Sequence, residues 1–206
     1  MKLDEKGLLI VLSGPSGVGK GTVREALFKR EDHNLVYSIS MTTRSPRVGE
    51  KNGREYFFVS KDEFEENIRN GKMLEYAEFV GNYYGTPLEE VKKQLKNGNE
   101  VVLEIEVQGA LQVREKMKDA IFVFIAPPSI EALYNRLKLR GTEDESVIQS
   151  RIAKAKKELD LAYKYDYIVV NDTVDNAADR IMAIIRAEHA KTERTIHKYK
   201  EILGVK

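Results

Sequence analysis

The sequence predicts an α/β fold, in which a parallel β-sheet carries helices on both faces. Four short apolar runs lie at residues 8–13, 101–107, 121–126 and 167–170, and each is nearly continuous rather than alternating. Strands of a parallel sheet have this pattern because both of their faces are buried. Segments with helical periodicity lie between the runs, as the crossover connections of a parallel sheet require.

The clearest helical segment follows the last apolar run. Its apolar side chains recur at helical spacing and share one face, at Val174, Ala177, Ala178, Ile181, Ile184 and Ile185. A stripe of this width is typical of a helix that packs on the face of a sheet.

Residues 38–90 interrupt the frame and predict a small β-rich lobe. Aromatic runs of β type lie at 55–59 and 73–84. Between them, Ser60 and Glu63 have the spacing of a capping box and predict the start of a short helix.

Residues 127–159 form a second insertion, which begins with Pro127-Pro128 and continues as polar, helical sequence. We interpret it as a helical lid over the sheet. The remaining segments, 1–37, 91–126 and 160–206, are then the core.

Composition excludes several classes of site. The 206 residues carry a formal net charge of +1, which gives no reason to expect nucleic acid or a membrane as a partner. The absence of cysteine excludes disulfides, thiolate nucleophiles and cysteine metal sites, and the three histidines are widely separated. No apolar run has membrane-spanning length and the first residues lack a signal peptide's apolar stretch, so we expect a cytoplasmic protein. Its oligomeric state stays open.

A glycine-rich segment after the first apolar run is the strongest functional signal. It has the pattern GxxxxGK and comprises Gly14, Pro15, Ser16, Gly17, Val18, Gly19, Lys20, Gly21 and Thr22. Between a strand and a helix, such a loop turns its amide groups toward phosphates and adds the positive end of the helix and a lysine. The alternative is an ordinary glycine-rich turn, which the lysine and the flanking elements make less favourable. The segment predicts a binding site for a nucleoside triphosphate such as ATP.

One position departs from the usual pattern of this loop. Gly21 stands where serine or threonine normally follows the lysine, and Thr22 comes one residue later. We therefore expect Mg²⁺ to be held mainly by phosphates and water, with Thr22 as a contact that is direct or water-mediated.

A second loop, at residues 40–50, gathers hydroxyl groups and two arginines. The guanidinium groups of Arg44 and Arg47 match phosphate oxygens in a bidentate manner, which suits a dianionic monophosphate. Taken alone, the loop has the alternative of being merely charged and solvated.

Seven segments together resemble the guanylate kinase family. They are SGPSGVGKGT, SISMTTRSPRVGE, EYFFV, EYAEFVGNYYGTP, LEIEVQGA, FIAPPS and RGTE, in that order and over residues 8 to 172. The resemblance implies a P-loop nucleoside-monophosphate kinase fold with a parallel-sheet core, a β-rich GMP-binding lobe and a helical lid. It implies transfer of the γ-phosphoryl group of ATP to GMP, giving ADP and GDP, with Mg²⁺ present.

The resemblance also implies roles for residues in the lobe. The contacts to the GMP phosphate are Ser40, Arg44, Arg47, Tyr56 and Tyr84. The guanine base is read by Glu75 and Thr86, with Glu106 as a further base contact.

These base contacts fit the chemistry of guanine. Its N1–H and 2-amino group are adjacent donors, which a carboxylate such as Glu75 accepts, and its O6 accepts from a hydroxyl such as Thr86. Adenine has the opposite pattern there and would leave a buried carboxylate without donors. Each residue has an alternative: Thr86 with Glu89 has capping-box spacing, Glu75 fits a solvent-facing strand position, and both tyrosines fit a core.

Two carboxylates end the apolar run at 101–107. Glu104 and Glu106 are two residues apart, which predicts that they share one face of the strand, at the edge where parallel sheets bind ligands. The family usually carries aspartates here, and the resemblance implies a position for Glu104 on the Mg²⁺ side. The alternative is a pair of exposed charges.

The lid and the last strand supply the remaining candidates. The resemblance implies that Arg136, Arg140 and Arg151 contact the ATP phosphates and the transferring group, and that Asn171 lies near the adenine. We interpret Lys154, Lys156 and Lys157 as a solvated helix face.

Two other functions stay open. The chain could phosphorylate another monophosphate such as AMP or dTMP, although Glu75 and Thr86 favour guanine. It could also be a catalytically inactive, guanylate-kinase-like interaction module, although Lys20, Arg44 and Arg47 are intact.

Overall fold

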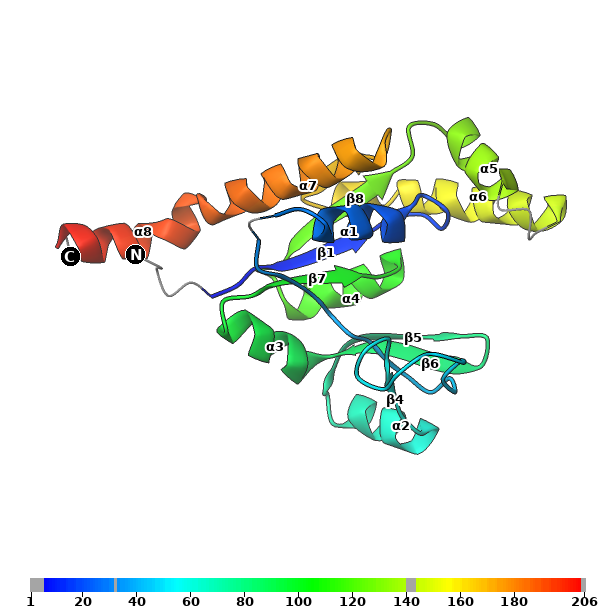
Figure 1. Ribbon diagram of the computed structural model, residues 1–206, viewed down its shortest axis with the longest axis horizontal. Helices are drawn as coiled ribbons and strands as arrows, with labels where there is room; N and C mark the ends of the chain where they lie inside the picture. The colour runs from blue at the N-terminus through cyan, green and yellow to red at the C-terminus, as the bar shows by residue number, and fades with distance from the viewer. Residues whose placement is uncertain (1–5, 32, 140–143, 205–206) are drawn as a thin grey trace.

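The computed structural model describes residues 6–31, 33–139 and 144–204 and contains two sheets (Figure 1). The larger sheet has five parallel strands in the order β2-β7-β1-β8-β9. They are β1 (Leu9–Ser13), β2 (Leu35–Tyr37), β7 (Glu100–Glu104), β8 (Ile121–Ala126) and β9 (Tyr167–Val170). The α/β fold with a parallel core is therefore confirmed, and the sequence pattern missed only the short edge strand β2.

Helices cover both faces of this sheet. On one face, α1 (Lys20–Phe28) and α7 (Val174–His189) pack against Ile10 and Leu12 of β1. On the other, α3 (Leu88–Lys96) and α4 (Val107–Lys116) pack against Leu9 and Val11. All five residues of β1 are buried, because this central strand alternates its side chains between two apolar layers.

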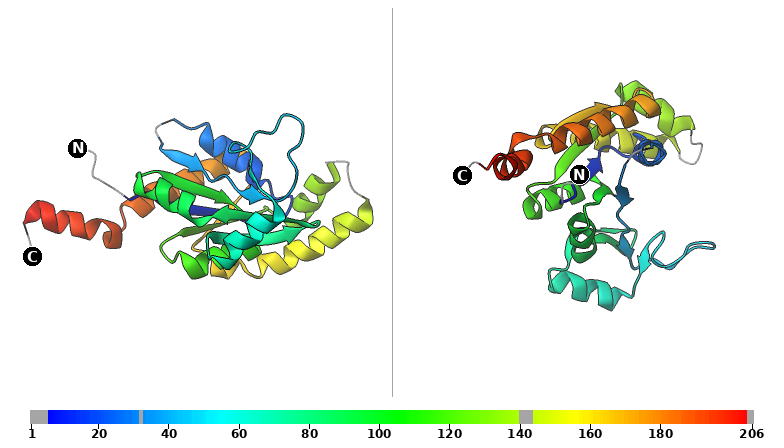
Figure 2. Two further views of the ribbon diagram at one scale, coloured as in Figure 1. Left: turned by 90° about the horizontal axis from the view of Figure 1, so that it is seen from below. Right: turned by 60° about the vertical axis from the view of Figure 1, so that its left-hand side comes forward.

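The smaller sheet has the strand order β4-β3-β6-β5 and lies below the core in Figure 1. Its elements are β3 (Met41–Thr42), β4 (Phe57–Phe58), α2 (Lys61–Arg69), β5 (Met73–Phe79) and β6 (Asn82–Pro87). The predicted cap of α2 is present, since the Ser60 hydroxyl accepts from the Glu63 amide at 3.2 Å. Figure 2 shows the loop between β3 and β4 extending away from this sheet.

The run at 73–84 is a hairpin rather than one strand. β5 and β6 pair antiparallel on either side of a turn at Val80 and Gly81, where both residues have positive φ. Val80 is the one non-glycine residue with positive φ in the described part of the chain. The Gly81-Asn82 pair was the available turn signal.

A helical hairpin lies over the carboxyl end of the core sheet. It consists of α5 (Ile130–Leu139) and α6 (Glu145–Leu159), joined face to face by Leu133, Leu137, Ile148, Ile152 and Ala155. The chain returns through the short helix η1 (Ala162–Lys164) to β9, and α8 (Thr192–Leu203) follows α7 and projects from the body (Figure 2). No helix in the described ranges has the length and apolar content needed to cross a bilayer.

Two local predictions are wrong. Strand β7 ends at Glu104, and Glu106 is the N-cap residue of α4, with extended φ and ψ of −71° and 160°. Helix α3 begins at Leu88 with Pro87 at its N-cap, so Thr86 does not cap it. In both places the strand ends and the chain turns into a helix, and that change of direction overrides the local pattern.

Candidate active site

The glycine-rich loop joins β1 to α1 under tight steric limits. Gly14 has a φ of 148°, and a Cβ built on it would lie 2.2 Å from the carbonyl oxygen of Ile125 in the neighbouring strand. Gly19 is the N-cap of α1 in the left-handed region, with a φ of 95°. Only glycine combines these conformations with such close approach, so the loop has the geometry of a phosphate-binding loop.

Lys20 folds back over the loop. Its ammonium donates to the carbonyl oxygens of Gly14 at 2.7 Å and Pro15 at 3.2 Å. It also lies 3.7 Å from a carboxylate oxygen of Glu106. The charge is thus held at the mouth of the loop, where outer phosphates of a triphosphate would replace the carbonyl contacts.

A cleft of about 360 Å³ opens beside the loop. Its lining residues are Gly17, Gly19, Thr22, Arg136, Leu139, Asn171 and Val174. Asn171 is 2% exposed, and its amide donates to the Val18 carbonyl at 2.8 Å. Its Oδ1 has no hydrogen-bond partner within the described residues, which leaves a buried acceptor next to the cleft.

Arg136 of the lid is tied to the same loop. Its guanidinium donates to the carbonyl oxygens of Val18 at 3.0 Å and Asn171 at 2.8 Å. The structure thus brings Arg136 to the phosphate loop, as expected. Arg151 lies on α6 and is half-buried, whereas Arg140 lies outside the described residues.

Glu104 lies beside Gly21, the position at which this loop departs from the usual phosphate-loop pattern. A Cβ on Gly21 would be 3.5 Å from Oε1 of Glu104, so the longer carboxylate occupies space next to Gly21. Arg24, one helical turn after Lys20, approaches Glu104 at 3.3 Å and stacks on the Tyr37 ring at 4.4 Å. Burial raises the pKa of Glu104, and the Arg24 and Lys20 charges oppose that rise.

Glu106 does not form a buried pair with Glu104, which corrects the prediction that both share one strand face. Its side chain is 54% exposed, and its carboxylate lies between Lys20 and Lys154, 3.4 Å from the latter. Lys154 also approaches Glu158 at 3.5 Å. Lys154 is 61% exposed and pairs with Glu158 one helical turn away, which fits its interpretation as part of a solvated helix face; in addition, it links α6 to Glu106 beside the phosphate loop.

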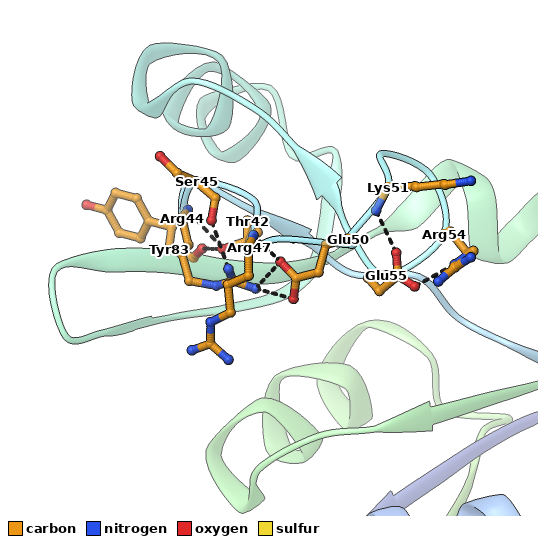
Figure 3. A network of polar contacts seen from close by, with 9 residues as sticks. All are labelled: Thr42, Arg44, Ser45, Arg47, Glu50, Lys51, Arg54, Glu55 and Tyr83. Atoms are coloured by element: carbon orange, nitrogen blue, oxygen red, sulfur yellow. Dashed lines mark hydrogen bonds and ion pairs between the residues drawn. The ribbon is translucent and has the colours of Figure 1, made fainter.

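The arginine loop is organised by Glu50 (Figure 3). Nη2 of Arg44 donates to both oxygens of Glu50, at 2.9 and 3.0 Å, and the amide of Arg47 donates to the same carboxylate at 2.7 Å. The Arg44 hydrogen bond holds the pKa of Glu50 below its usual value. Nη1 of Arg44 donates to the Ser45 carbonyl at 2.8 Å, so this guanidinium has a fixed orientation.

Two tyrosines surround the Arg44 guanidinium. It lies 5.5 Å from the Tyr56 ring centre, and the rings of Tyr56 and Tyr84 meet edge to face at 6.1 Å. Burial raises the pKa of the Tyr56 hydroxyl. Ser40 precedes β3, and its carbonyl accepts from the Phe57 amide at 2.9 Å. The structure therefore brings Arg44, Tyr56 and Tyr84 together, with Ser40 directly before the adjoining strand β3.

Glu75 and Thr86 form a buried pair across the β5–β6 hairpin. They are register partners, they are 6% and 0% exposed, and the Thr86 hydroxyl donates to Oε1 of Glu75 at 2.7 Å. Burial raises the pKa of Glu75, while the Thr86 hydrogen bond and the charge of Lys116 lower it. The solvent-facing alternative for Glu75 is thus wrong.

Strand β6 links the Glu75–Thr86 pair to the arginine cluster, because it carries both Thr86 and Tyr84. Tyr84 and Thr86 are two residues apart on β6, so they lie on the same face about 7 Å from each other. One end of this face has a cation and hydroxyls, and the other has a carboxylate and a hydroxyl. A mononucleotide has the matching order of phosphate and base.

Helix α4 connects this surface with the phosphate loop. Its N-cap Glu106 contacts Lys20, and Gly109 in its first turn lies against Glu75, where an added Cβ would be 2.7 Å from Oε2. The two contacts are about 5 Å apart along the helix axis. The loop lysine and the buried glutamate are therefore positioned by a single helical turn.

The family model described as guanylate kinase matches residues 6–188. The chain belongs to the guanylate kinase family. A guanylate kinase of Onion yellows phytoplasma (strain OY-M) is 61% identical over 204 residues, which cover 98% of this chain and 96% of that protein. A guanylate kinase of Bacillus subtilis (strain 168) is 56% identical over 203 residues, which cover 98% of this chain and all of that protein.

A solved guanylate kinase structure supports the same fold. The crystal structure from Anaplasma phagocytophilum has a TM-score of 0.74 and 37% identity, with coverage of 97% of this chain and 96% of that one. The P-loop nucleoside-monophosphate kinase fold expected of this guanylate kinase family member is thereby confirmed.

Sequence reasoning missed four residues of this guanylate kinase family site. Arg24 holds Glu104, Glu50 holds Arg44, Lys154 approaches Glu106, and Gly109 faces Glu75. The sequence contained a signal for Arg24, because it is four residues after Lys20 and therefore lies on the same side of a predicted helix. Glu50 is also local, six residues after Arg44, whereas Lys154 and Gly109 depend on contacts between segments far apart in the chain.

No group of three potential metal-binding side chains occurs in the described ranges. The cavity of about 450 Å³ at the amino end of β1, lined in part by Lys6, Leu95 and Arg194, contains none of the candidate site residues. It therefore does not bear on the chemistry of this site.

Proposed function

We propose that this chain is an ATP:GMP phosphotransferase, which moves the γ-phosphoryl group of ATP to GMP and forms ADP and GDP. One observation carries the proposal. Lys20 of the phosphate loop contacts Glu106, the N-cap of α4, and the buried Glu75–Thr86 pair lies against Gly109, three residues later in the first turn of the same helix. A donor phosphate and an acceptor nucleotide would thus be aligned on one rigid element.

The acceptor assignment follows from hydrogen-bonding chemistry. Glu75 presents a buried carboxylate to the N1–H and 2-amino donors of guanine, and Thr86 presents a hydroxyl. The hydroxyl now donates to Glu75, so it must rotate to donate to O6. The GMP phosphate would lie at the other end of β6, against Arg44, Arg47, Tyr56 and Tyr84, with Ser40 beside them.

The donor assignment rests on the loop and the adjoining cleft. Gly14 to Thr22 would surround the ATP phosphates with amide donors, and Lys20 would move from its carbonyl contacts to the outer phosphates. The cleft lined by Asn171 and Arg136 suits the nucleoside, and the unsatisfied Oδ1 of Asn171 can accept from the adenine amino group.

Phosphoryl transfer then needs alignment, neutralisation of charge and exclusion of water. The GMP phosphate attacks the γ-phosphorus directly, so no protein nucleophile takes part. Lys20, Arg44, Arg136 and Arg151 would surround the transferring group and stabilise its negative charge. Arg140 has the same proposed role, although it lies outside the described residues.

Mg²⁺ would neutralise charge on the triphosphate when it is bound. The residues present fit an ion that keeps phosphate and water ligands, because Thr22 is exposed at the cleft and Glu104 is the neighbouring half-buried carboxylate. We assign both a supporting position through water.

We divide the chain into a core (1–37, 91–126 and 160–206), a GMP-binding lobe (38–90) and a lid (127–159). The lobe would close on GMP and the lid on ATP, which excludes water. We place the reaction in the cytoplasm with ATP and GMP as partners.

A coupled assay for ADP tests the proposal with GMP, AMP and dTMP as acceptors, each with and without Mg²⁺. We expect rapid turnover with GMP and Mg²⁺ and little with the other acceptors. If kcat/KM were higher for AMP or dTMP than for GMP, that monophosphate would be the acceptor. If none of the three were phosphorylated, the inactive interaction module would be favoured.

A further inference from the structure

Strand β5, which carries Glu75, is at the edge of the smaller sheet. The strand order β4-β3-β6-β5 leaves one side of β5 without a strand partner. An edge strand exposes backbone N–H and C=O groups that another element must cover or water must hydrate. Here helix α4 of the core lies along that edge (Figure 1).

Gln112 of α4 bonds this edge as a neighbouring strand would. Its Oε1 accepts from the Tyr76 amide at 3.1 Å, and its Nε2 donates to the Tyr76 carbonyl at 2.9 Å. A side-chain amide has the same acceptor and donor as a peptide group, so one glutamine satisfies both backbone groups of one residue. Tyr76 is the residue that follows Glu75.

A second hydrogen bond comes from the same side of α4. The ammonium of Lys116 donates to the Met73 carbonyl at 2.9 Å. Gly109, Gln112 and Lys116 are three and four residues apart, which places them along one helix face. The backbone on both sides of Glu75 is thus hydrogen-bonded to α4.

Gly109 sets how close the carboxylate of Glu75 lies to this face. A Cβ on Gly109 would be 2.7 Å from Oε2 and 3.4 Å from Cδ of Glu75. The first of these distances is shorter than real Cβ contacts in proteins, so a side chain at position 109 would displace the Glu75 carboxylate. The other oxygen of Glu75 is held by Thr86.

We propose that the α4 seam, formed by Gly109, Gln112 and Lys116 against β5, determines acceptor affinity and base specificity by fixing the carboxylate of Glu75 to the core. Gln112 and Gly109 are positioning residues, because they act on GMP through Glu75. The proposal rests on the proposed GMP kinase function. It places the base-reading group on the core side of the lobe, while the arginine loop is anchored elsewhere, through Glu50.

Two variants test the seam separately. Gly109→Ala adds one methyl group against Glu75 at a helical position where alanine is intrinsically favoured. Gln112→Met keeps the length of the side chain and removes both hydrogen bonds to Tyr76. Glu115→Ala, at an exposed site on the same helix, is the matched control.

The readouts are KM for GMP, KM for ATP and the ratio of kcat/KM for GMP to that for inosine monophosphate, which lacks the 2-amino donor. We expect a rise of about tenfold in KM for GMP in Gly109→Ala and about fivefold in Gln112→Met, as for the loss of a buried hydrogen bond. The ratio of kcat/KM for GMP to kcat/KM for inosine monophosphate should fall in both variants, and KM for ATP should stay within about twofold of the parent value. Glu115→Ala should match the parent protein.

The proposal is overturned if KM for GMP and the ratio stay within about twofold of the parent in a folded variant. An equal rise in KM for both substrates would also overturn it, because that indicates general loss of structure. Thermal unfolding establishes folding, and Gln112→Met provides the test should Gly109→Ala fail to fold. A parent protein that makes no GDP would instead refute the proposed function.

Discussion

The hydroxyl of Thr86 donates to Oε1 of Glu75 across 2.7 Å, inside the hairpin and nearly out of contact with solvent. An ionised carboxylate in such a place lacks the hydration it has in the unfolded chain. One hydrogen bond from Thr86 and the charge of Lys116 offset part of that cost, and burial still raises the pKa of Glu75. A guanine base would supply the missing donors.

Glu75→Gln should therefore separate base specificity from stability. Glutamine presents one acceptor oxygen and an NH₂ group, which repels the guanine donors, so preference for GMP over other purine monophosphates should fall at least about tenfold. The ligand-free variant should have a higher Tm than the parent at pH 7, because no buried charge remains. Unchanged preference in the acceptor assay would contradict the base-reading role.

The pH dependence of GMP binding should follow Glu75. Its raised folded-state pKa means that protonation stabilises the fold: this contribution is complete below the ordinary value of 4.5 and is lost as pH rises through the folded-state pKa. GMP needs the ionised form, so KM for GMP should rise as pH falls through that same pKa. The GMP phosphate also titrates, with a second pKa of about 6. Glu75→Gln keeps that titration and lacks the one at residue 75, so the difference between the two pH profiles reports Glu75.

Lys20→Ala should reduce kcat by roughly 10²–10³-fold, because the ammonium neutralises charge that develops in the transition state. KM for GMP should change little, since Lys20 has no contact with the Glu75–Thr86 pair. Steady-state assays give both values. Near-normal turnover would refute the role of Lys20.

Arg44 and Glu50 should differ in their effects. Arg44→Ala removes a phosphate contact, and KM for GMP should rise roughly 10- to 100-fold with KM for ATP unchanged. Glu50→Gln leaves the arginine but weakens its orientation, so a rise of only about threefold is expected. A fall in KM for GMP in Glu50→Gln would mean that Glu50 competes with the phosphate.

Arg24→Met should destabilise the ligand-free protein by about 1–2 kcal/mol at pH 7, because a half-buried Glu104 loses its nearest cation. Loss of that cation raises the pKa of Glu104 further, so the destabilisation should diminish as the carboxyl group becomes protonated in acid. Denaturant unfolding of the variant and the parent, at pH 7 and in acid, measures the difference in stability at each pH. In a double-mutant cycle with Glu104→Gln, additive effects would show that the pair does not interact.

Periodicity predicted most of the fold. The four apolar runs are four of the five core strands, and five of the six residues in the stripe on α7, all except Val174, lie in the core layer that contains Ile10 and Leu12 of β1. Apart from the short strand β2, the misses occur where a strand ends. At Glu104 to Glu106 and at Thr86 to Leu88 the chain passes from a strand into a helix, and local spacing contains no information about where the strand stops.

The amino-acid sequence by itself determined the phosphate loop, since only glycine tolerates the backbone at Gly14 and Gly19, and the order of strands and helices, since burial on two faces requires continuous apolar runs. Tertiary structure decided which groups far apart in the chain meet. Arg44 with Glu50 is a local pair, but Arg24 with Glu104, Lys154 with Glu106 and Gly109 with Glu75 join segments far apart in the chain. Such contacts depend on how elements pack in three dimensions, and electrostatic and steric effects act over distances in space rather than along the chain.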